Sequence, residues 1–460
     1  MYSLMSKDNR SAEVADALRE RAATMRPGDR LPPVRDLVQE FRASAATISH
    51  ALAHLQAVGV LKAEPGRGTF VTGRNRLPEA DYSWQSQALG RARVDIRRTT
   101  RLGAHGGPDD IQLSWGYLAA ELQPIDDLRA LGARAARSSH AWSMMPPTGL
   151  PDLRRAFAAE YHAEPGDVLV VPGGQQALVY AMRTLAEPGM AVVVESPTYP
   201  GAMIAAQSAG LELVAVPADG EGIRTDKLAD ALERTRATLL YLQPCYANPT
   251  GTVLPPARRQ EILRLAAEHG AFVIEDDWAR HLVIDGAPPP PLLTDDPDGH
   301  VVSITTLTKP VAPGMRVAAV IARGPAGERL RGARVADDMC VPAVLQETAL
   351  GLLTSSAWPR HLKRLRSRLG ERRDAMLSEL HATGLRMRVA QVPTGGIHLW
   401  ARLPEGTDTA ALSRRAQEAG VLIGDGSQFF IDEPPAPFLR LSYATASIPQ
   451  IAEGIRRFAQ

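Results

Sequence analysis

Apolar residues recur at helical spacing three times within the first 60 residues of the chain. Each set falls on one helical face, at intervals of three or four residues. The sets are Val14, Leu18, Ala22 and Met25; Val34, Leu37, Val38 and Phe41; and Ile48, Ala51, Leu52 and Leu55. The pattern predicts three short helices, of which the first ends at Pro27-Gly28 and the third is capped by Ser44.

Two short apolar segments, 60–62 and 69–71, follow the third set and flank the turn Pro65-Gly66-Arg67-Gly68. A glycine turn between two such segments predicts a hairpin. Helices followed by a hairpin favour a winged helix-turn-helix, in which the helix that begins at Ser44 would enter the DNA major groove. Helical spacing alone leaves a protein-interaction module as an alternative.

From about residue 111 the pattern changes to short apolar runs separated by helical segments. Seven runs lie at 168–172, 191–195, 212–216, 238–242, 271–275, 301–305 and 317–322. Such alternation favours a mainly parallel sheet covered by helices on both faces. From about residue 340 a helix-rich stretch leads to strand-like segments at 396–402 and 438–443, which predicts a smaller α+β subdomain. The expected fold class is therefore α/β, preceded by a helical head.

Between these patterns lies a stretch with little periodicity, and we divide the chain into a domain at 1–75, a linker at 76–110 and a domain at 111–460. The linker contains a basic cluster of Arg91, Arg93, Arg97, Arg98 and Arg101. A solvated tether is its plainest interpretation, and contact with DNA or with the second domain is the alternative.

The composition is that of an ordinary globular chain, with 45% hydrophobic residues and a formal net charge of +1 over 460 residues. This charge excludes a strongly electrostatic partner for the chain as a whole, although residues 1–80 are mildly basic, with 12 basic and 9 acidic residues. Cys245 and Cys340 have neither metal-ligand spacing nor a disulfide pattern, so we expect a cytoplasmic chain without a metal site. We find no signal peptide and no apolar run near the ~18 residues of a membrane span.

Lysine is scarce, with five of the 52 basic residues, so Lys309 in the segment 303–310 (SITTLTKP) stands out. It follows an apolar strand, at the edge where open α/β sheets bind ligands. Partial desolvation there would lower the pKa of the amine and make it a nucleophile. Thr306, Thr308 and Arg316 suit a phosphate beside it. On this motif alone, a surface lysine is an equal alternative.

Polar groups on three other segments would reach the same edge. Residues 172–178 (PGGQQAL) open a helix after a strand, where backbone N–H groups can hold a phosphate. Asn248 follows the run at 238–242, and Glu275, Asp276 and Asp277 end another strand. Turn chemistry and solvated charge are the plainer interpretations of these segments.

The segments 31–37 (LPPVRDL), 46–48 (ATI) and 66–71 (GRGTFV) resemble the GntR-type winged helix over its full length. The resemblance implies DNA contacts from Arg35, Ser44, Ala45, Thr47, Ser49, His50 and Arg67. Many family members have an arginine where Ala45 stands. An alanine side chain cannot hydrogen-bond a base, so the resemblance does not predict which bases the protein reads.

Residues 111–460 resemble, in the order of their motifs, the fold-type I aminotransferases that use pyridoxal 5′-phosphate (PLP). The resemblance implies Lys309 as the Schiff-base lysine and Asp276 as the partner of the pyridinium nitrogen. The other implied cofactor-binding residues are Asn248 on the phenolic oxygen, Tyr199 on the ring face, and Gly174, Gln175, Thr306, Thr308 and Arg316 around the phosphate. Arg440 and Gly116 are the implied effector- or substrate-binding residues, with Arg440 binding a carboxylate.

Two residues depart from the aminotransferase pattern. Trp278, which we include among the cofactor-binding residues, stands where relatives usually have a tyrosine that reaches the phenolic oxygen, and an indole N–H donates but cannot accept or ionise. Met144 stands where aminotransferases commonly place a tyrosine that reaches the phosphate bound by the other subunit. We therefore expect at most vestigial transaminase activity.

A GntR-like winged helix joined to an aminotransferase-like domain resembles the MocR subfamily of bacterial transcriptional regulators from end to end. The implied function is a PLP-binding regulator in which an amino compound displaces Lys309, forms an external aldimine, and changes how the protein binds its double-stranded DNA operator. The resemblance also implies a head-to-tail homodimer. Two alternatives stay open: an active aminotransferase with a DNA-binding head, and a regulator that no longer uses PLP.

Overall fold

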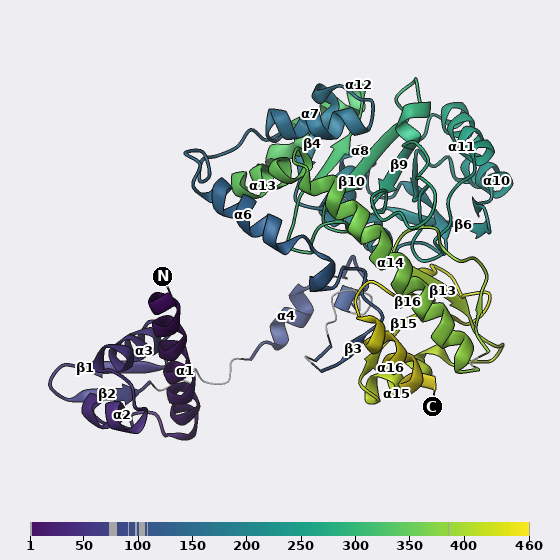
Figure 1. Cartoon of the computed structure of the whole chain (residues 1–460). Coiled ribbons are helices and arrows are strands. Elements are labelled where there is room, and N and C mark those ends of the chain that lie inside the picture. Colours follow the sequence, from purple (N-terminus) through teal and green to yellow (C-terminus); the bar gives the residue numbers. More distant parts are fainter. Residues whose placement is uncertain are drawn as a thin grey trace. The chain divides into compact units, whose positions relative to one another are not determined.

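The computed structural model describes residues 2–72, 81–90, 92–96, 99–100, 106–107, 109–384 and 386–459, with side chains from residue 10 onward. The chain divides into two compact units, Met1–Arg91 and Ala92–Gln460 (Figure 1). Arg93 of the basic linker cluster is exposed, and the other four members, Arg91, Arg97, Arg98 and Arg101, lie outside the described residues.

The first unit packs three helices against a two-stranded wing. Its elements are α1 (Tyr2–Thr24), α2 (Val34–Glu40), α3 (Ala45–Ala57), β1 (Leu61–Glu64), β2 (Gly68–Val71) and the short α4 (Ser83–Ala88). The strands are antiparallel, with Leu61 opposite Val71. Ser44 caps α3, because its Oγ accepts a hydrogen bond from the Thr47 N–H at 3.1 Å. The predicted apolar stripes, including Leu18, Leu37 and Ile48, form the buried core, which confirms the winged helix-turn-helix.

The second unit is built on an eight-stranded sheet in the order β4-β11-β10-β9-β8-β5-β6-β7. The strands are β4 (Val168–Val171), β5 (Ala191–Ser196), β6 (Glu212–Asp219), β7 (Gly222–Ile223), β8 (Leu239–Leu242), β9 (Phe272–Asp277), β10 (Val301–Thr306) and β11 (Ala318–Ile321). All seven predicted runs are present. The sheet is mainly parallel, as expected, but β11 runs antiparallel between β4 and β10, and β7 is an added antiparallel edge.

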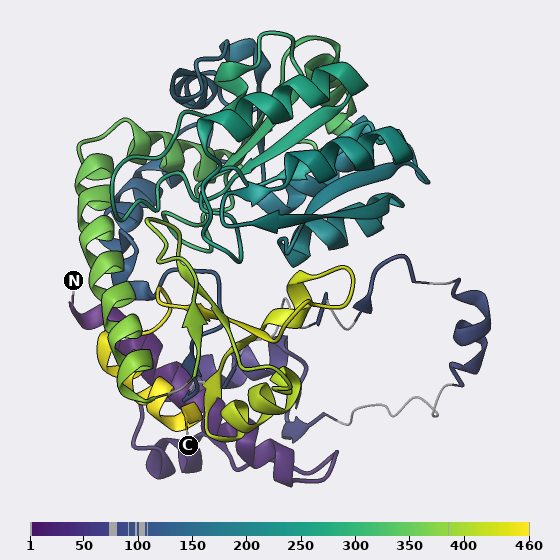
Figure 2. The same cartoon turned by 90° about the vertical axis from the view of Figure 1, so that its right-hand side faces the viewer.

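Helices cover both faces of this sheet (Figure 2). Alternate strand residues divide between the two faces. Val170, Val193 and Val273 pack under α7 (Pro151–Glu160), α10 (Thr225–Thr235), α11 (Pro256–His269) and α13 (Ala343–Leu353). Leu169, Val192 and Ile274 pack under α8 (Gly174–Leu185), α9 (Pro200–Ala209) and α12 (Gly324–Ala333). Burial on both faces explains why these strands are continuous apolar runs.

A smaller α+β part follows the helices α13 and α14 (Ala357–Ala382), as predicted. Its four-stranded antiparallel sheet has the order β12-β13-β16-β15, formed by Arg388–Val389, His398–Arg402, Phe438–Ser442 and Gly424–Asp425. Helices α15 (Thr409–Glu418) and α16 (Ile448–Ala459) complete it. The strand β3 (Ile111–Gln112), far away in sequence, pairs with β14 (Val421–Leu422), so the segment that follows it is tied to this part as well. In the part of the chain that the structure describes, no helix has the length and apolar character needed to cross a membrane.

Candidate functional site

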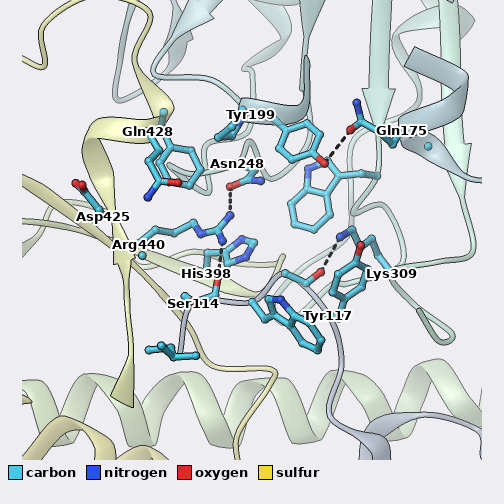
Figure 3. A pocket seen from close by; sticks show the side chains of 18 of the residues that line it. Ser114, Tyr117, Gln175, Tyr199, Asn248, Lys309, His398, Asp425, Gln428 and Arg440 are labelled. Carbon is cyan, nitrogen blue, oxygen red and sulfur yellow. Dashed lines mark hydrogen bonds between the residues drawn. The ribbon is translucent and has the colours of Figure 1, made fainter. Parts of the chain in front are cut away.

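The carboxyl ends of the parallel strands face a cavity of about 510 Å³ (Figure 3). It is lined by every residue of the second domain to which the aminotransferase resemblance assigned a binding role. These are Gly116, Gly174, Gln175, Tyr199, Asn248, Asp276, Trp278, Thr306, Thr308, Lys309, Arg316 and Arg440. The fold thus brings together side chains from distant segments, on both the large sheet and the smaller α+β part.

Lys309 lies in the turn that follows β10, with its amine directed into the cavity (Figure 3). Its Nζ donates a hydrogen bond to the carbonyl oxygen of Gly116 at 2.7 Å and lies 3.8 Å from the ring centre of Tyr117. Burial, aided by the positive charge of Arg440, lowers the pKa of Lys309 to about 7. A large share of this amine is therefore neutral, and hence nucleophilic, near neutral pH.

An anion cradle lies at the N-terminus of α8, where backbone N–H groups are unpaired by the helix itself. Gly173 has φ +98°, and a Cβ at this position would lie 2.5 Å from Nη2 of Arg316, so only glycine lets the guanidinium approach. Thr306 packs on Gly174, and the Thr308 N–H donates to Thr306 Oγ1 at 3.2 Å. These donors suit a phosphate group.

The three acids of β9 do not act alike, because successive side chains point to opposite faces of the sheet. Glu275 accepts from the backbone N–H of Leu292 at 2.6 Å, and Asp277 accepts from the Tyr161 hydroxyl at 2.7 Å and pairs with Arg280. These two acids are structural. Asp276 alone lines the cavity.

Asp276 is buried, and its Oδ2 accepts hydrogen bonds from the Tyr241 hydroxyl at 2.7 Å and from Gln243 Nε2 at 2.8 Å. Burial raises the pKa of Asp276 to about 6, although both hydrogen bonds oppose this. A carboxylate in this setting is ready to pair with a cationic ring nitrogen.

Arg440 comes from β16 and connects the two parts of the site. Its Nη1 donates to Asn248 Oδ1 at 3.0 Å and its Nη2 donates to the carbonyl oxygen of Ser114 (Figure 3). The carbon of its guanidinium lies over the ring of Phe429, 4.8 Å from the ring centre. On the opposite wall, the Tyr199 hydroxyl donates to Gln175 Oε1 at 3.1 Å. Burial raises the pKa of Tyr199, so its phenol stays protonated.

The two departures from the aminotransferase pattern differ in position. Trp278 is buried against the cavity, and within the described part of the chain its Nε1 has no hydrogen-bond partner. Met144 is exposed and does not line the cavity of its own chain.

Among the lining residues that sequence reasoning missed, four bear on the chemistry of the cavity: Ser114, Tyr117, Gln243 and His398. Gln243 follows β8, at the same sheet edge as Asp276, and this position was a usable signal. Ser114 and Tyr117 lie on a segment without periodicity. No group of three or more His, Cys, Asp or Glu side chains in the described residues could hold a metal ion.

The DNA-binding residues predicted in the first unit lie on α2, α3 and the wing. The side chain of Arg35 is 84% exposed, beside Asp36, and that of Arg67 is also exposed, with its Nη1 donating to Glu64 Oε2 at 2.6 Å. Ser44, Ala45 and Ser49 are exposed and Thr47 is half-buried. One ring nitrogen of His50 already has a hydrogen-bond partner in the protein, since its Nδ1 lies 3.2 Å from Ser11 Oγ on α1.

Comparison with known proteins separates the same two units. Residues 10–71 match the model of the bacterial regulatory proteins of the gntR family, and residues 109–458 match that of aminotransferase class I and II. The chain is 30% identical over 441 residues to an uncharacterized HTH-type transcriptional regulator, YdfD of Bacillus subtilis, with 93% of this chain and 90% of the relative covered. It is 27% identical over 454 residues to the probable rhizopine catabolism regulatory protein MocR of Rhizobium meliloti, with 94% and 89% covered.

A solved structure resembles the second unit. It is LysN, the alpha-aminoadipate aminotransferase of Thermus thermophilus, complexed with N-(5′-phosphopyridoxyl)-L-leucine. The TM-score is 0.76 at 31% identity, with 82% of this chain and 97% of that chain covered.

Proposed function

Because this chain belongs to the GntR-type transcriptional regulators of MocR architecture, with a winged-helix head joined to a domain of aminotransferase class I and II, we propose that it regulates transcription by sensing an amino compound at PLP. Binding to operator DNA and the PLP cofactor follow from this membership. Covalent sensing at Lys309, and the roles of the other site residues, are the proposal.

The observation that carries the proposal is the fit of the cavity to PLP. Gly174, Thr306, Thr308 and Arg316 would hold the phosphate, and the buried Asp276 would pair with the ring nitrogen. Lys309 offers a primary amine whose pKa is near neutrality. When bound, PLP supplies an aldehyde carbon to which amines add reversibly and a ring that withdraws electrons.

The protein's own groups would make the exchange of amines reversible. Lys309 would give up its place to the amine of the effector and then hydrogen-bond the Gly116 carbonyl oxygen, as its Nζ does at 2.7 Å. Arg440 would leave Ser114 and Asn248 to bind the acid group of the effector. These changed contacts, at Asn248 and on segment 114–117, would distinguish the two states, and such a difference is what a ligand needs to shift an equilibrium.

The test is a scan of amino compounds against the PLP-loaded protein, with the visible spectrum recorded at each addition. We expect a small set of compounds to shift the spectrum saturably and without steady formation of a keto acid. A protein that takes up no PLP, or whose spectrum no amine changes, would contradict the proposal.

An active aminotransferase with a DNA-binding head is the second candidate. Lys309, Asp276 and Arg440 line one cavity, and the structural relative LysN is an aminotransferase. The tryptophan at 278 argues against it, because its Nε1 can donate a hydrogen bond but cannot accept one. Keto acid released at about 1 per second or faster would favour the enzyme.

We also propose a head-to-tail homodimer. Trp142 and Met144 are 84% and 69% exposed in the single chain. Large apolar side chains that lie close together on a surface commonly mark a protein interface. The two DNA-binding domains of one dimer would bind paired half-sites more tightly than either domain alone.

Replacing Arg35 by alanine should weaken DNA binding about tenfold and lower the salt dependence by about one phosphate contact. The PLP spectrum should not change, because Arg35 belongs to the other unit. Fluorescence anisotropy with a duplex selected by the protein from a random pool measures the affinity at several salt concentrations. Arg129→Ala, on the exposed face of α6 (Ile125–Ala136), is the control. Equal affinities of Arg35→Ala and wild type would remove Arg35 from the interface.

Replacing Arg440 by alanine should weaken binding of the effector by a factor of about ten or more, because a hydrogen bond to a charged group contributes about 1.5–3 kcal/mol. Titration of the PLP spectrum with the effector found in the scan measures this. An unchanged response would mean that no carboxylate is bound there, and a sulfonate or a plain amine becomes the better candidate.

A further inference from the structure

A buried histidine that the function above does not use lies in the wall of the same cavity. His398 is 5% exposed, and Figure 3 shows its ring directed into the hollow together with Arg440 and Lys309. Within the described residues its Nε2 is buried and has no hydrogen-bond partner. Buried polar atoms are nearly always paired, so one that faces a ligand cavity points to a ligand atom as its partner.

Strand register fixes His398 beside Arg440. In the antiparallel pair β13–β16, His398 lies opposite Ser442 and Trp400 lies opposite Arg440. Residues two apart on a strand share a face, so His398 and Arg440 are diagonal neighbours on one face of the sheet. Both side chains thus rise from rigid strands.

His398 is also close to Lys309. Its Nε2 and the Lys309 Nζ each lie 3.5 Å from the point that a Cβ on residue 116 would occupy. Gly116 therefore leaves a small space that both nitrogens border. Consider an amino acid whose amine takes the place of the Lys309 amine and whose acid group reaches Arg440. Such a ligand would lie alongside His398.

The charges around the His398 imidazole determine which kind of ligand atom it can bind. Burial, and then the positive charges of Arg440 and Lys309, hold the pKa of His398 well below its usual range, so the imidazole is neutral. A neutral imidazole carries one N–H, which it can place on Nε2. Arg440 Nε, a donor, is likewise buried without a partner in the described part of the chain. Two unpartnered nitrogens in a positive field suit the two oxygens of a carboxylate.

We propose that His398 is a specificity-determining residue, which together with Arg440 binds the carboxylate of an amino-acid effector. This inference rests on the proposed function. It assigns to the protein a preference for carboxylate-bearing amines over plain amines of the same size, part of which comes from a neutral hydrogen-bond donor rather than from charge.

The test uses two amines that react with PLP whatever the natural effector is. Aminooxyacetate carries a carboxylate, and O-methylhydroxylamine is its counterpart without one. Each replaces the Lys309 amine on PLP, with loss of the visible absorbance. The ratio of their second-order rate constants measures the contribution of the carboxylate, and O-methylhydroxylamine controls for general damage to the site.

We expect His398→Phe to lower this ratio about tenfold, the effect of a hydrogen bond to a charged group. His398→Gln, which keeps a donor at similar reach, should stay within about threefold of wild type. His300→Phe is the matched control, since His300 is half-buried at the opposite end of β10 from Lys309, and it should leave the ratio unchanged. If the phenylalanine variant does not accumulate, His398→Leu replaces it.

A ratio within about twofold of wild type in the phenylalanine or leucine variant, together with a large fall in Arg440→Gln, would overturn the inference. Equal losses of rate for both amines would also overturn it, because they would mark His398 as merely structural. Failure of the proposed function gives a different result, since the wild-type protein would then show no PLP absorbance, or an absorbance that neither amine changes.

Discussion

The Lys309→Ala variant should lose the visible absorbance of covalently bound PLP completely, and with it all response to amino compounds. Lys309 is the only lysine among the described residues that line the cavity. Its amine cannot be replaced by arginine, which stays protonated. Lys309→Arg should therefore fail equally, although it keeps a positive charge.

Absorbance spectra of the purified variants, loaded with PLP and desalted, measure this effect. Lys363→Ala is the control, because Lys363 is exposed on α14, and its spectrum should match the wild type. A wild-type spectrum from Lys309→Ala would refute the assignment of the lysine.

The Asp276→Asn variant should bind PLP on the order of 100-fold more weakly, because removal of one partner of a buried charge pair costs about 3 kcal/mol or more. Asparagine keeps the shape of the side chain and an oxygen for Tyr241 and Gln243, so the loss reports charge. PLP titration of the apoprotein, followed by absorbance, gives the affinity.

Although Asp276→Asn should weaken PLP binding, it should not destabilise the apoprotein and can stabilise it. Burial raises the folded-state pKa of Asp276 from 3.8 to about 6, so the free energy of unfolding of the apoprotein falls as the pH rises from about 4 to about 6 and stays lower above pH 6. Asp276→Asn should thus have an equal or higher Tm at pH 8, while Asp285→Asn, at an exposed position, should leave PLP affinity unchanged. An Asp276→Asn variant with wild-type PLP affinity would remove Asp276 from the cofactor site.

The sequence predicted the second unit well where function follows from strand ends. Lys309, Asn248 and the β9 acids follow or end apolar runs, and parallel strands bring their ends to one edge. The family resemblance selected Asp276, but the residue pattern alone could not separate it from Glu275 and Asp277. The side-chain alternation becomes informative only when the strand is seen to continue through all three acids.

His398 shows a different limit of the sequence. It lies within a predicted strand, where a polar residue in an apolar run gives no sign of what it faces. Only the register with β16 places it beside Arg440. Likewise, the pairing of Ile111–Gln112 with β14 depends on a contact between segments far apart in the chain, which local pattern cannot reveal.

The central claim is that one event, the exchange of amines at Lys309, both changes the spectrum and alters DNA binding. The most direct measurement titrates one amino compound into PLP-loaded protein with labelled operator DNA present, recording absorbance and anisotropy together. The account predicts that both signals change with the same midpoint in the wild type and that neither changes in Lys309→Ala. A spectral change with steady keto-acid release and unchanged DNA affinity would contradict it.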